Sequence, residues 1–193
     1  MSTVNAPLIT VFGSSRTVPE DRLYKEGVNL GKELAKHGFR VCTGGYGGLM
    51  EAVSRGASEA GSSPIGITFT AFGDECNAFV REQRRASDLF TRLGYLIRDS
   101  DGYIVMRGGM GTIAELMLAW VYVESGLRAQ VPIVLLGECW RELITALQEH
   151  FTFTDKDFSF VEHAATPEEA VWRLKTLFHI SQLTTENEYT DAS

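Results

Sequence analysis

Short apolar segments alternate with longer amphipathic segments along most of this chain, which is the pattern of strands connected by helices. Because such strands are apolar on both faces, they predict a parallel sheet that helices cover on both sides. We therefore expect an α/β, Rossmann-like three-layer fold with a mostly parallel sheet. Five segments read as buried strands and Phe158–Glu162 as a short sixth; the five are Leu8–Phe12, Phe39–Thr43, Pro64–Thr68, Gly102–Met106 and Val131–Leu136.

The segments between these strands carry helical patterns. Helices are expected over Pro19–His37, Leu49–Ala60, Arg84–Arg98, Thr112–Glu124 and Trp140–His150, and a last one opens at Thr166 and Pro167. The stretch Thr70–Val80 has no clear period and predicts a loop. Residues 1–180 are expected to form a single domain, and the polar residues 181–193 a flexible C-terminal tail.

The charge distribution argues against a nucleic-acid partner. The net charge is −7, whereas proteins that follow a phosphate backbone carry basic stripes. The one basic cluster is local and suits a small anion better than a polymer; it comprises Arg81, Arg84, Arg85 and Arg92.

The cysteines and the N-terminus indicate a cytoplasmic setting. Three widely spread cysteines fit neither a disulfide framework nor a zinc pattern. We expect no signal peptide, because the first residues lack a charged segment followed by an apolar run, and no membrane span, because no apolar run approaches about 18 residues. The four scattered histidines suggest neither a metal site nor a catalytic triad, so no metal and no cofactor are predicted.

The most informative local motif is Gly108-Gly109-Met110-Gly111-Thr112, which follows an expected strand and opens a helix that contains Glu115. Glycines let the backbone approach a bound group closely, and the amides at a helix start attract an anion. Thr112 adds a hydroxyl group. The motif therefore predicts a phosphate site, although a tight turn without a ligand would have some of the same residues.

Two further turns follow expected strands and strengthen this prediction. The first strand ends at Gly13, Ser14 and Ser15, a turn that could contact a base or ribose or be a simple loop. No Walker-type phosphate loop is present. The second strand is followed by four glycines that we also expect to contact the nucleotide: Gly44, Gly45, Gly47 and Gly48.

Two charged residues are candidates for chemistry beside this site. Glu115 lies one helical turn after Gly111 and so can face the cleft, where it would interact with sugar hydroxyls or with positive charge in a transition state. An ordinary solvated glutamate in a first turn is the alternative. Arg92 lies among leucines, a setting in which an arginine meets a carboxylate or extends its charge to solvent.

These residues together resemble the cytokinin-activating phosphoribohydrolase family, often called LOG, whose members were long labelled possible lysine decarboxylases. The resemblance covers about Leu8 to Leu136 and rests on GGYGGLMEAVSRGA and RGGMGTIAE. The family motif P-G-G-x-G-T-x-x-E falls on Gly108 to Glu115, with Arg107 in place of its proline. Of the preceding M-H-x-R-K element only the arginine is kept, as Arg92.

The resemblance implies a Rossmann-like fold, a catalytic pair formed by Arg92 and Glu115, and glycine turns that bind the nucleotide phosphate, with Arg107 beside them. The implied reaction hydrolyses the N-glycosidic bond of an AMP-like or cytokinin-type nucleoside 5′-monophosphate, giving free base and ribose 5-phosphate. The family also implies a homodimer or a higher homo-oligomer. The apolar helix with Trp120 and Tyr122 fits such an interface, although a buried core helix would look the same.

Two alternatives of a different class stay open. One is a non-catalytic carrier or sensor that binds a nucleotide or the molybdenum cofactor on the same turns, since related folds serve as carriers of that cofactor. The other is a nucleotide-dependent dimeric scaffold. A lysine decarboxylase is disfavoured, because no lysine lies where a pyridoxal phosphate Schiff base would need one.

Overall fold

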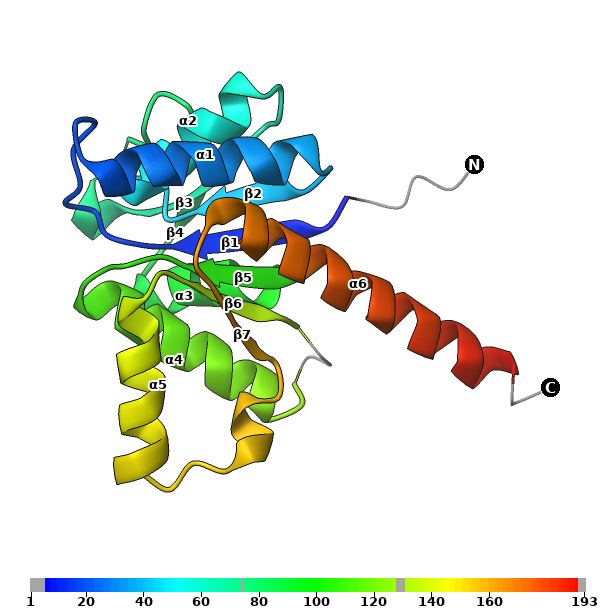
Figure 1. The fold of residues 1–193 in the computed structure, drawn as a ribbon. Coiled ribbons are helices and arrows are strands. Elements are labelled where there is room, and N and C mark those ends of the chain that lie inside the picture. The colour runs from blue at the N-terminus through cyan, green and yellow to red at the C-terminus, as the bar shows by residue number, and fades with distance from the viewer. Residues whose placement is uncertain (1–5, 74, 128–130, 191–193) are drawn as a thin grey trace.

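The computed structural model describes residues 6–73, 75–127 and 131–190, with side chains as far as Phe178. Its centre is a seven-stranded, wholly parallel sheet in the order β4-β3-β2-β1-β5-β6-β7 (Figure 1). The expected α/β fold is thus confirmed. The strands are β1 (Leu8–Phe12), β2 (Arg40–Thr43), β3 (Ile65–Phe69), β4 (Glu82–Ala86), β5 (Gly102–Val105), β6 (Ile133–Leu136) and β7 (Val161–Ala164).

Helices cover both faces of the sheet, and two short 3-10 helices, η1 and η2, lie in the connections (Figure 1). One face packs against α1, α2 and α6, and the other against α3, α4 and α5. The bounds are α1 (Arg22–Lys36), α2 (Leu49–Glu59), η1 (Thr70–Phe72), α3 (Leu89–Arg98), α4 (Met110–Glu124), α5 (Cys139–His150), η2 (Asp155–Phe158) and α6 (Pro167–Thr190).

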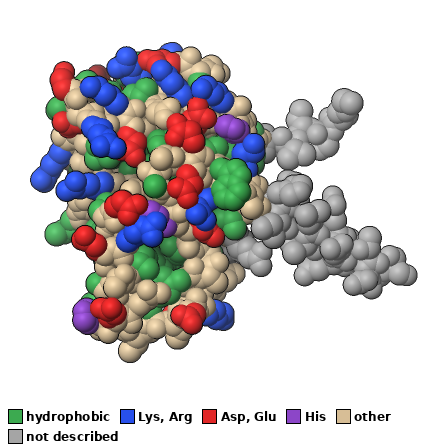
Figure 2. All heavy atoms as spheres, in the orientation of Figure 1, with side chains coloured by type: hydrophobic (Ala, Val, Ile, Leu, Met, Phe, Trp, Pro, Cys, Tyr) green, Lys and Arg blue, Asp and Glu red, His purple; other side chains and the backbone are tan. Residues whose placement is uncertain are grey.

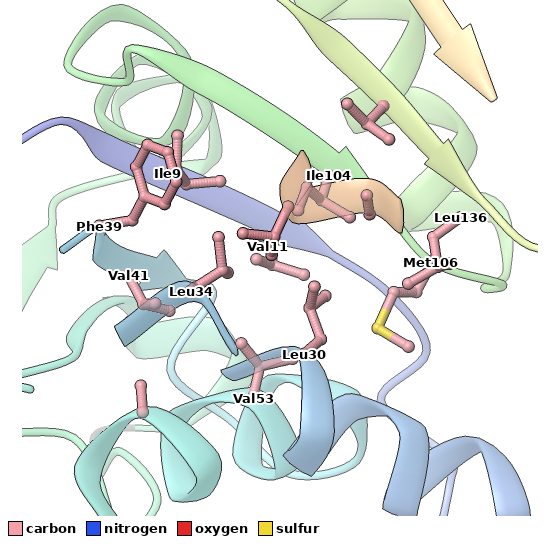
Figure 3. Close-up of a cluster of buried hydrophobic side chains, with 14 of the residues drawn as sticks. Ile9, Val11, Leu30, Leu34, Phe39, Val41, Val53, Ile104, Met106 and Leu136 are labelled. Atoms are coloured by element: carbon pink, nitrogen blue, oxygen red, sulfur yellow. The ribbon is translucent and has the colours of Figure 1, made fainter. Parts of the chain in front are cut away.

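The core on the α1 and α2 face is built from alternate residues of the central strands. Ile9 and Val11 of β1 belong to one buried cluster with Leu30 and Leu34 of α1 (Figure 3). Because both faces of β1 are covered, every residue of this strand is buried. This is why its residues are apolar on both faces, apart from Thr10, rather than alternating between apolar and polar.

The strand order creates one natural place for a ligand. The chain moves from β1 outward through β2, β3 and β4, then returns to place β5 on the other side of β1. The register pairs Phe12 with Val105, so β1 and β5 end side by side. In open α/β sheets, ligands bind outside the carboxyl ends of the strands where the order reverses in this way. Here that point lies between β1 and β5.

The prediction of a helix over Arg84–Arg98 is wrong at its start, because β4 occupies Glu82–Ala86 and α3 begins only at Leu89. β4 is an edge strand that pairs with β3 alone, and its first four residues are polar. An edge strand buries little side-chain surface and is often protected by charges. Its sequence therefore lacks the apolar signal by which the other strands were found.

Smaller differences concern where elements begin and end. β7 lies three residues later than the strand expected over Phe158–Glu162, since residue 158 still belongs to η2. α1 begins at Arg22 rather than at Pro19. α6 continues to Thr190, ten residues into the segment expected to be a tail, and residues 191–193 lie outside the described part. The flexibility of that segment stays a prediction.

The face in Figure 2 carries interspersed basic and acidic side chains rather than a field of one sign. Within the described residues, no helix combines the length and the apolar character needed to cross a membrane.

Candidate functional site

A cleft of about 640 Å³ lies at the carboxyl ends of the strands around the point where the order reverses. Its walls come from the turns after β1, β2 and β5, from η1 after β3, and from side chains of α3 and α4. The lining residues are Gly13, Ser14, Ser15, Arg16, Tyr46, Gly47, Met50, Phe72, Arg92, Gly109, Met110, Gly111, Thr112 and Glu115.

The start of α4 opens into this cleft. Its first helical hydrogen bond runs from the Ile113 amide to the Gly109 carbonyl, so the amides of residues 110–112 have no partner within the helix. A Cβ atom built on Gly109 or Gly111 would meet no atom within 4 Å. These two glycines therefore leave the helix start accessible, which is the arrangement that favours an anion.

Arg92 and Glu115 meet at the base of the cleft. Arg92 Nη1 lies 3.4 Å from Glu115 Oε1, and the two side chains are only 6% and 15% exposed. Backbone contacts fix the guanidinium further, because Nε donates to the Ile67 carbonyl at 3.0 Å and Nη2 to the Gly44 carbonyl at 3.4 Å. The pair is therefore held by α3, α4, β3 and the turn after β2.

The environment of Glu115 makes its carboxyl group a weaker acid than an exposed glutamate. Burial raises the pKa of Glu115 above its ordinary value, while the charge and hydrogen bond of Arg92 oppose this shift in part. The carboxylate therefore has a charged partner but little water. A perturbed group of this kind in a cleft is a candidate for catalysis.

The glycine turn after β2 shapes the cleft more than it lines it. Gly47 lines the cleft, whereas Gly44, Gly45 and Gly48 are buried. A Cβ atom on Gly44 would collide with the Arg92 guanidinium, and one on Gly48, whose φ is +70°, would collide with the Ser14 carbonyl. Gly44 therefore makes room for the ion pair, and Gly48 lets two neighbouring turns pass each other.

Aromatic and thioether side chains also line the cleft, and the sequence did not predict them there: Tyr46, Met50, Phe72 and Met110. Tyr46 lies inside a predicted glycine turn, and Phe72 lies in the segment predicted only as a loop. Their signal was present, since both are large apolar residues next to the carboxyl ends of strands. No periodic pattern marked them, however, because they belong to connections.

The remaining predicted residues lie next to the cleft. Arg107 and Gly108 line an adjoining cavity of about 360 Å³ that shares Ser14, Arg16 and Gly109 with the cleft. Gly108 approaches Thr112 so closely that a Cβ atom would collide with the threonine hydroxyl. The other predicted residues line the cleft itself: Thr112 is buried there, Gly13 and Ser14 are half-buried, and Ser15 is exposed.

The basic cluster expected from the sequence is dispersed in the structure. Only Arg92 enters the cleft, while Arg81 bonds Ser58 and Arg84 pairs with Glu82 and Asp99. The reason is that Arg84 belongs to the edge strand β4 and not to the helix of Arg92. Among the residues that the structure describes, no group of three or more His, Cys, Asp or Glu side chains is placed to hold a metal ion.

Fold and cleft together define a Rossmann-like α/β protein whose site combines an open helix start with a buried arginine–glutamate pair. The chain belongs to the SLOG cluster4 family, whose model matches residues 6–171. The resemblance to the LOG family is confirmed by relatives that carry the LOG name.

One such relative is a cytokinin riboside 5′-monophosphate phosphoribohydrolase of Arabidopsis thaliana, 31% identical over 132 residues, which are 67% of this chain and 61% of the relative. The chain thus spans about three-fifths of that protein. An uncharacterized protein of Archaeoglobus fulgidus is 30% identical over 61% of this chain and 78% of its own length. Among solved structures, the molybdenum cofactor carrier protein of Chlamydomonas reinhardtii superposes with a TM-score of 0.71 at 27% identity, over 90% of this chain and 99% of that chain.

Proposed function

We propose that the cleft binds a nucleoside 5′-monophosphate and hydrolyses its N-glycosidic bond. The observation that carries this proposal is the position of the Arg92–Glu115 pair, one helical turn (about 5.4 Å) beyond an open helix start. A phosphate on the amides of residues 110–112 would place the ribose beside the carboxylate. The LOG relatives support the same reaction.

The proposed chemistry uses the two charges of the pair. As the C1′–N bond breaks, positive charge develops on the ribose, and the Glu115 carboxylate stabilises it. A water molecule supplies the oxygen that bonds to C1′; one of its protons stays on the new C1′ hydroxyl group and the other goes to the nitrogen of the departing base. Arg92 holds Glu115 in place and offers guanidinium hydrogens to the sugar. The products are free base and ribose 5-phosphate.

The phosphate contributes through binding rather than through reaction. It lies away from the breaking bond, so its contacts with Gly109, Gly111 and Thr112 serve to position the ribose against Glu115.

The experiment that tests the proposed reaction is an incubation of purified protein with AMP and other monophosphates, with free base measured by chromatography. We expect base release that Glu115→Ala abolishes. Equal release by that variant would remove Glu115 from the mechanism.

A carrier function is the second candidate. It is favoured by the match of 90% of this chain to the Chlamydomonas carrier. A carrier would hold its ligand on the same helix start without turnover. Tight binding of a monophosphate, together with no base release over hours, would select this candidate over the hydrolase.

We also propose that the protein is a homodimer whose interface is formed by α3 and α4. Apolar side chains lie exposed along these helices, and large exposed apolar patches mark association sites. A second copy is the occupant that fits, because the patch continues along α4 toward the cleft. The exposed residues are Phe90, Met110, Ile113, Leu118, Val121 and Leu127. Trp120, in contrast, is a core residue that donates a hydrogen bond to the Asp157 carbonyl.

The proposed setting is the cytoplasm. The three cysteines are free, which suits a reducing compartment; they are Cys42, Cys76 and Cys139.

A further inference from the structure

One wall of the cleft carries an exposed aromatic ring that the proposed reaction leaves without a role. Phe72 ends η1, directly after β3, and 58% of its surface is exposed although its ring is fully apolar. It lines the cleft together with Tyr46. An exposed phenylalanine inside a cleft offers a flat surface for another flat group.

The ring is held in position by its neighbours. It packs edge-to-face on Phe69, with centroids 5.4 Å apart, and on Tyr46, with centroids 6.3 Å apart. The Tyr46 hydroxyl fixes the segment as well, because it accepts a hydrogen bond from the Phe69 amide at 2.7 Å and lies within bonding distance of the Gly73 carbonyl. A prepositioned ring binds a ligand at a lower entropic cost than a mobile one.

The turn that bears Tyr46 is anchored in its own right. The Asn77 side-chain amide donates to the carbonyl oxygens of Gly45 and Tyr46, at 3.1 and 2.9 Å. The Asn77 backbone amide also donates to the Gly45 carbonyl at 2.8 Å. The segment after β3 is therefore fastened to the turn after β2 on both sides of Phe72.

The contacts of Arg92 show where Phe72 lies relative to Glu115. The Arg92 Cζ atom lies 5.8 Å from the ring centroid of Phe72 and equally far from that of Tyr46. Its guanidinium also reaches Glu115. The contacts thus lead from α4, which carries Glu115, to the Arg92 guanidinium and from there to the aromatic pair. A nucleoside monophosphate has the same order of phosphate, sugar and base.

We propose that Phe72 is the stacking surface for the base of the bound nucleotide and so determines base specificity. The inference rests on the proposed function, because it takes the phosphate and the sugar as placed there. Stacking strength grows with the ring system, so the cleft prefers a purine to a pyrimidine monophosphate. Phe72 acts on binding and positioning and takes no part in the proton or bond changes.

The test compares a ligand that has a base with one that lacks it. All proteins carry Glu115→Gln, which prevents turnover, and calorimetry gives dissociation constants for AMP and for ribose 5-phosphate. We expect Phe72→Ala to weaken AMP binding roughly tenfold, the loss of one base–aromatic stack, and to leave ribose 5-phosphate binding within about twofold. Phe72→Trp should restore AMP binding. The matched control is Phe151→Ala, since Phe151 is equally exposed but lies at the end of α5 outside the cleft.

Several results would overturn the proposal. An equal loss for both ligands would mean that Phe72 only maintains the loop. If the protein that keeps Phe72 binds AMP and ribose 5-phosphate with equal affinity, the cleft has no subsite for the base. The proposed phosphate site would not be affected by that result. A change of molar mass in Phe72→Ala would assign the ring to a subunit contact. If neither AMP nor ribose 5-phosphate binds, both the proposed function and this inference are wrong.

Discussion

Arg92 Nη1 lies 3.4 Å from Glu115 Oε1 at the base of the cleft, with both side chains largely buried. The two charges balance each other, so the carboxylate adds little net repulsion to a phosphate bound at the start of α4. A lone carboxylate at this position would repel the phosphate, and its pairing with Arg92 removes most of that repulsion.

Replacing the carboxylate should remove activity and leave binding intact. We expect Glu115→Gln to lower kcat for base release from AMP by at least about 100-fold, because the charge that stabilises the ribose cation is lost. Calorimetry should show ribose 5-phosphate bound as before. The control is Glu124→Gln, an exposed glutamate at the other end of α4, which should keep its full rate. Comparable rates in the two variants would refute the assignment.

Removing the arginine should affect the stability of the fold. Arg92→Met leaves a buried carboxylate without its partner, and we expect a loss of about 3 kcal/mol in the free energy of unfolding, measured in urea. Adding Glu115→Leu to Arg92→Met should recover much of this loss, since an apolar pair needs no countercharge. Arg22→Met at the exposed start of α1 should change the value by less than about 0.5 kcal/mol. No recovery in the double variant would show that Arg92 stabilises through its backbone contacts alone.

The sequence predicted those parts of the fold that have a strong local signal. The strands β1, β5 and β6 are buried along their whole length, and their sequences are mostly apolar because helices cover both of their faces. The edge strand β4 could not be found in this way, since its pairing with β3 depends on the rest of the sheet and its side chains face solvent.

The site was predictable to the extent that its chemistry lies on regular elements. Glu115 is on α4, at a fixed distance from the glycine turn, and Arg92 is on α3. Phe72 is visible in the sequence as a large apolar residue after an expected strand, but its place in the cleft was not predictable, because it depends on the contacts that Tyr46 makes with the connection after β3. The two glycine turns looked alike in sequence, and only the contacts around Gly44 and Gly109 separate them.

These contacts predict that the two glycine turns respond differently to substitution. Gly109→Val and Gly111→Val should fold with unfolding free energies within about 1 kcal/mol of the unsubstituted protein, since the new side chains enter open space. Both should weaken ribose 5-phosphate binding at least tenfold, roughly the loss of one charge-assisted hydrogen bond. Gly44→Ala and Gly48→Ala should instead destabilise the fold by about 1–3 kcal/mol. Unchanged phosphate binding in both valine variants would place the anion elsewhere.

The proposed dimer predicts a change of mass when its apolar surface is charged. Leu118→Glu and Val121→Glu place carboxylates on the exposed face of α4, and burying them in an interface would be costly. We expect sedimentation to give a dimer for the unsubstituted protein and a monomer for these variants. Phe151→Glu alters an equally exposed side chain outside the patch and should stay dimeric. A monomeric unsubstituted protein would refute the interface.

Burial of Glu115 predicts a specific dependence of stability on pH. Its pKa is raised in the fold, whereas in the unfolded chain it takes the ordinary glutamate value of about 4.3. Between these two values the folded state holds the proton and the unfolded state releases it, so rising pH favours unfolding. The Glu115→Gln variant has no titrating group at this position, so its unfolding free energy does not fall with pH in this way. Its unfolding free energy relative to the unsubstituted protein should therefore increase as pH rises from about 4 through the raised pKa, and then level off. Urea titrations at a series of pH values measure this difference, with Glu124→Gln as the control. A difference that decreases over the same range would mean that the charge of Arg92 outweighs burial and lowers the pKa of Glu115.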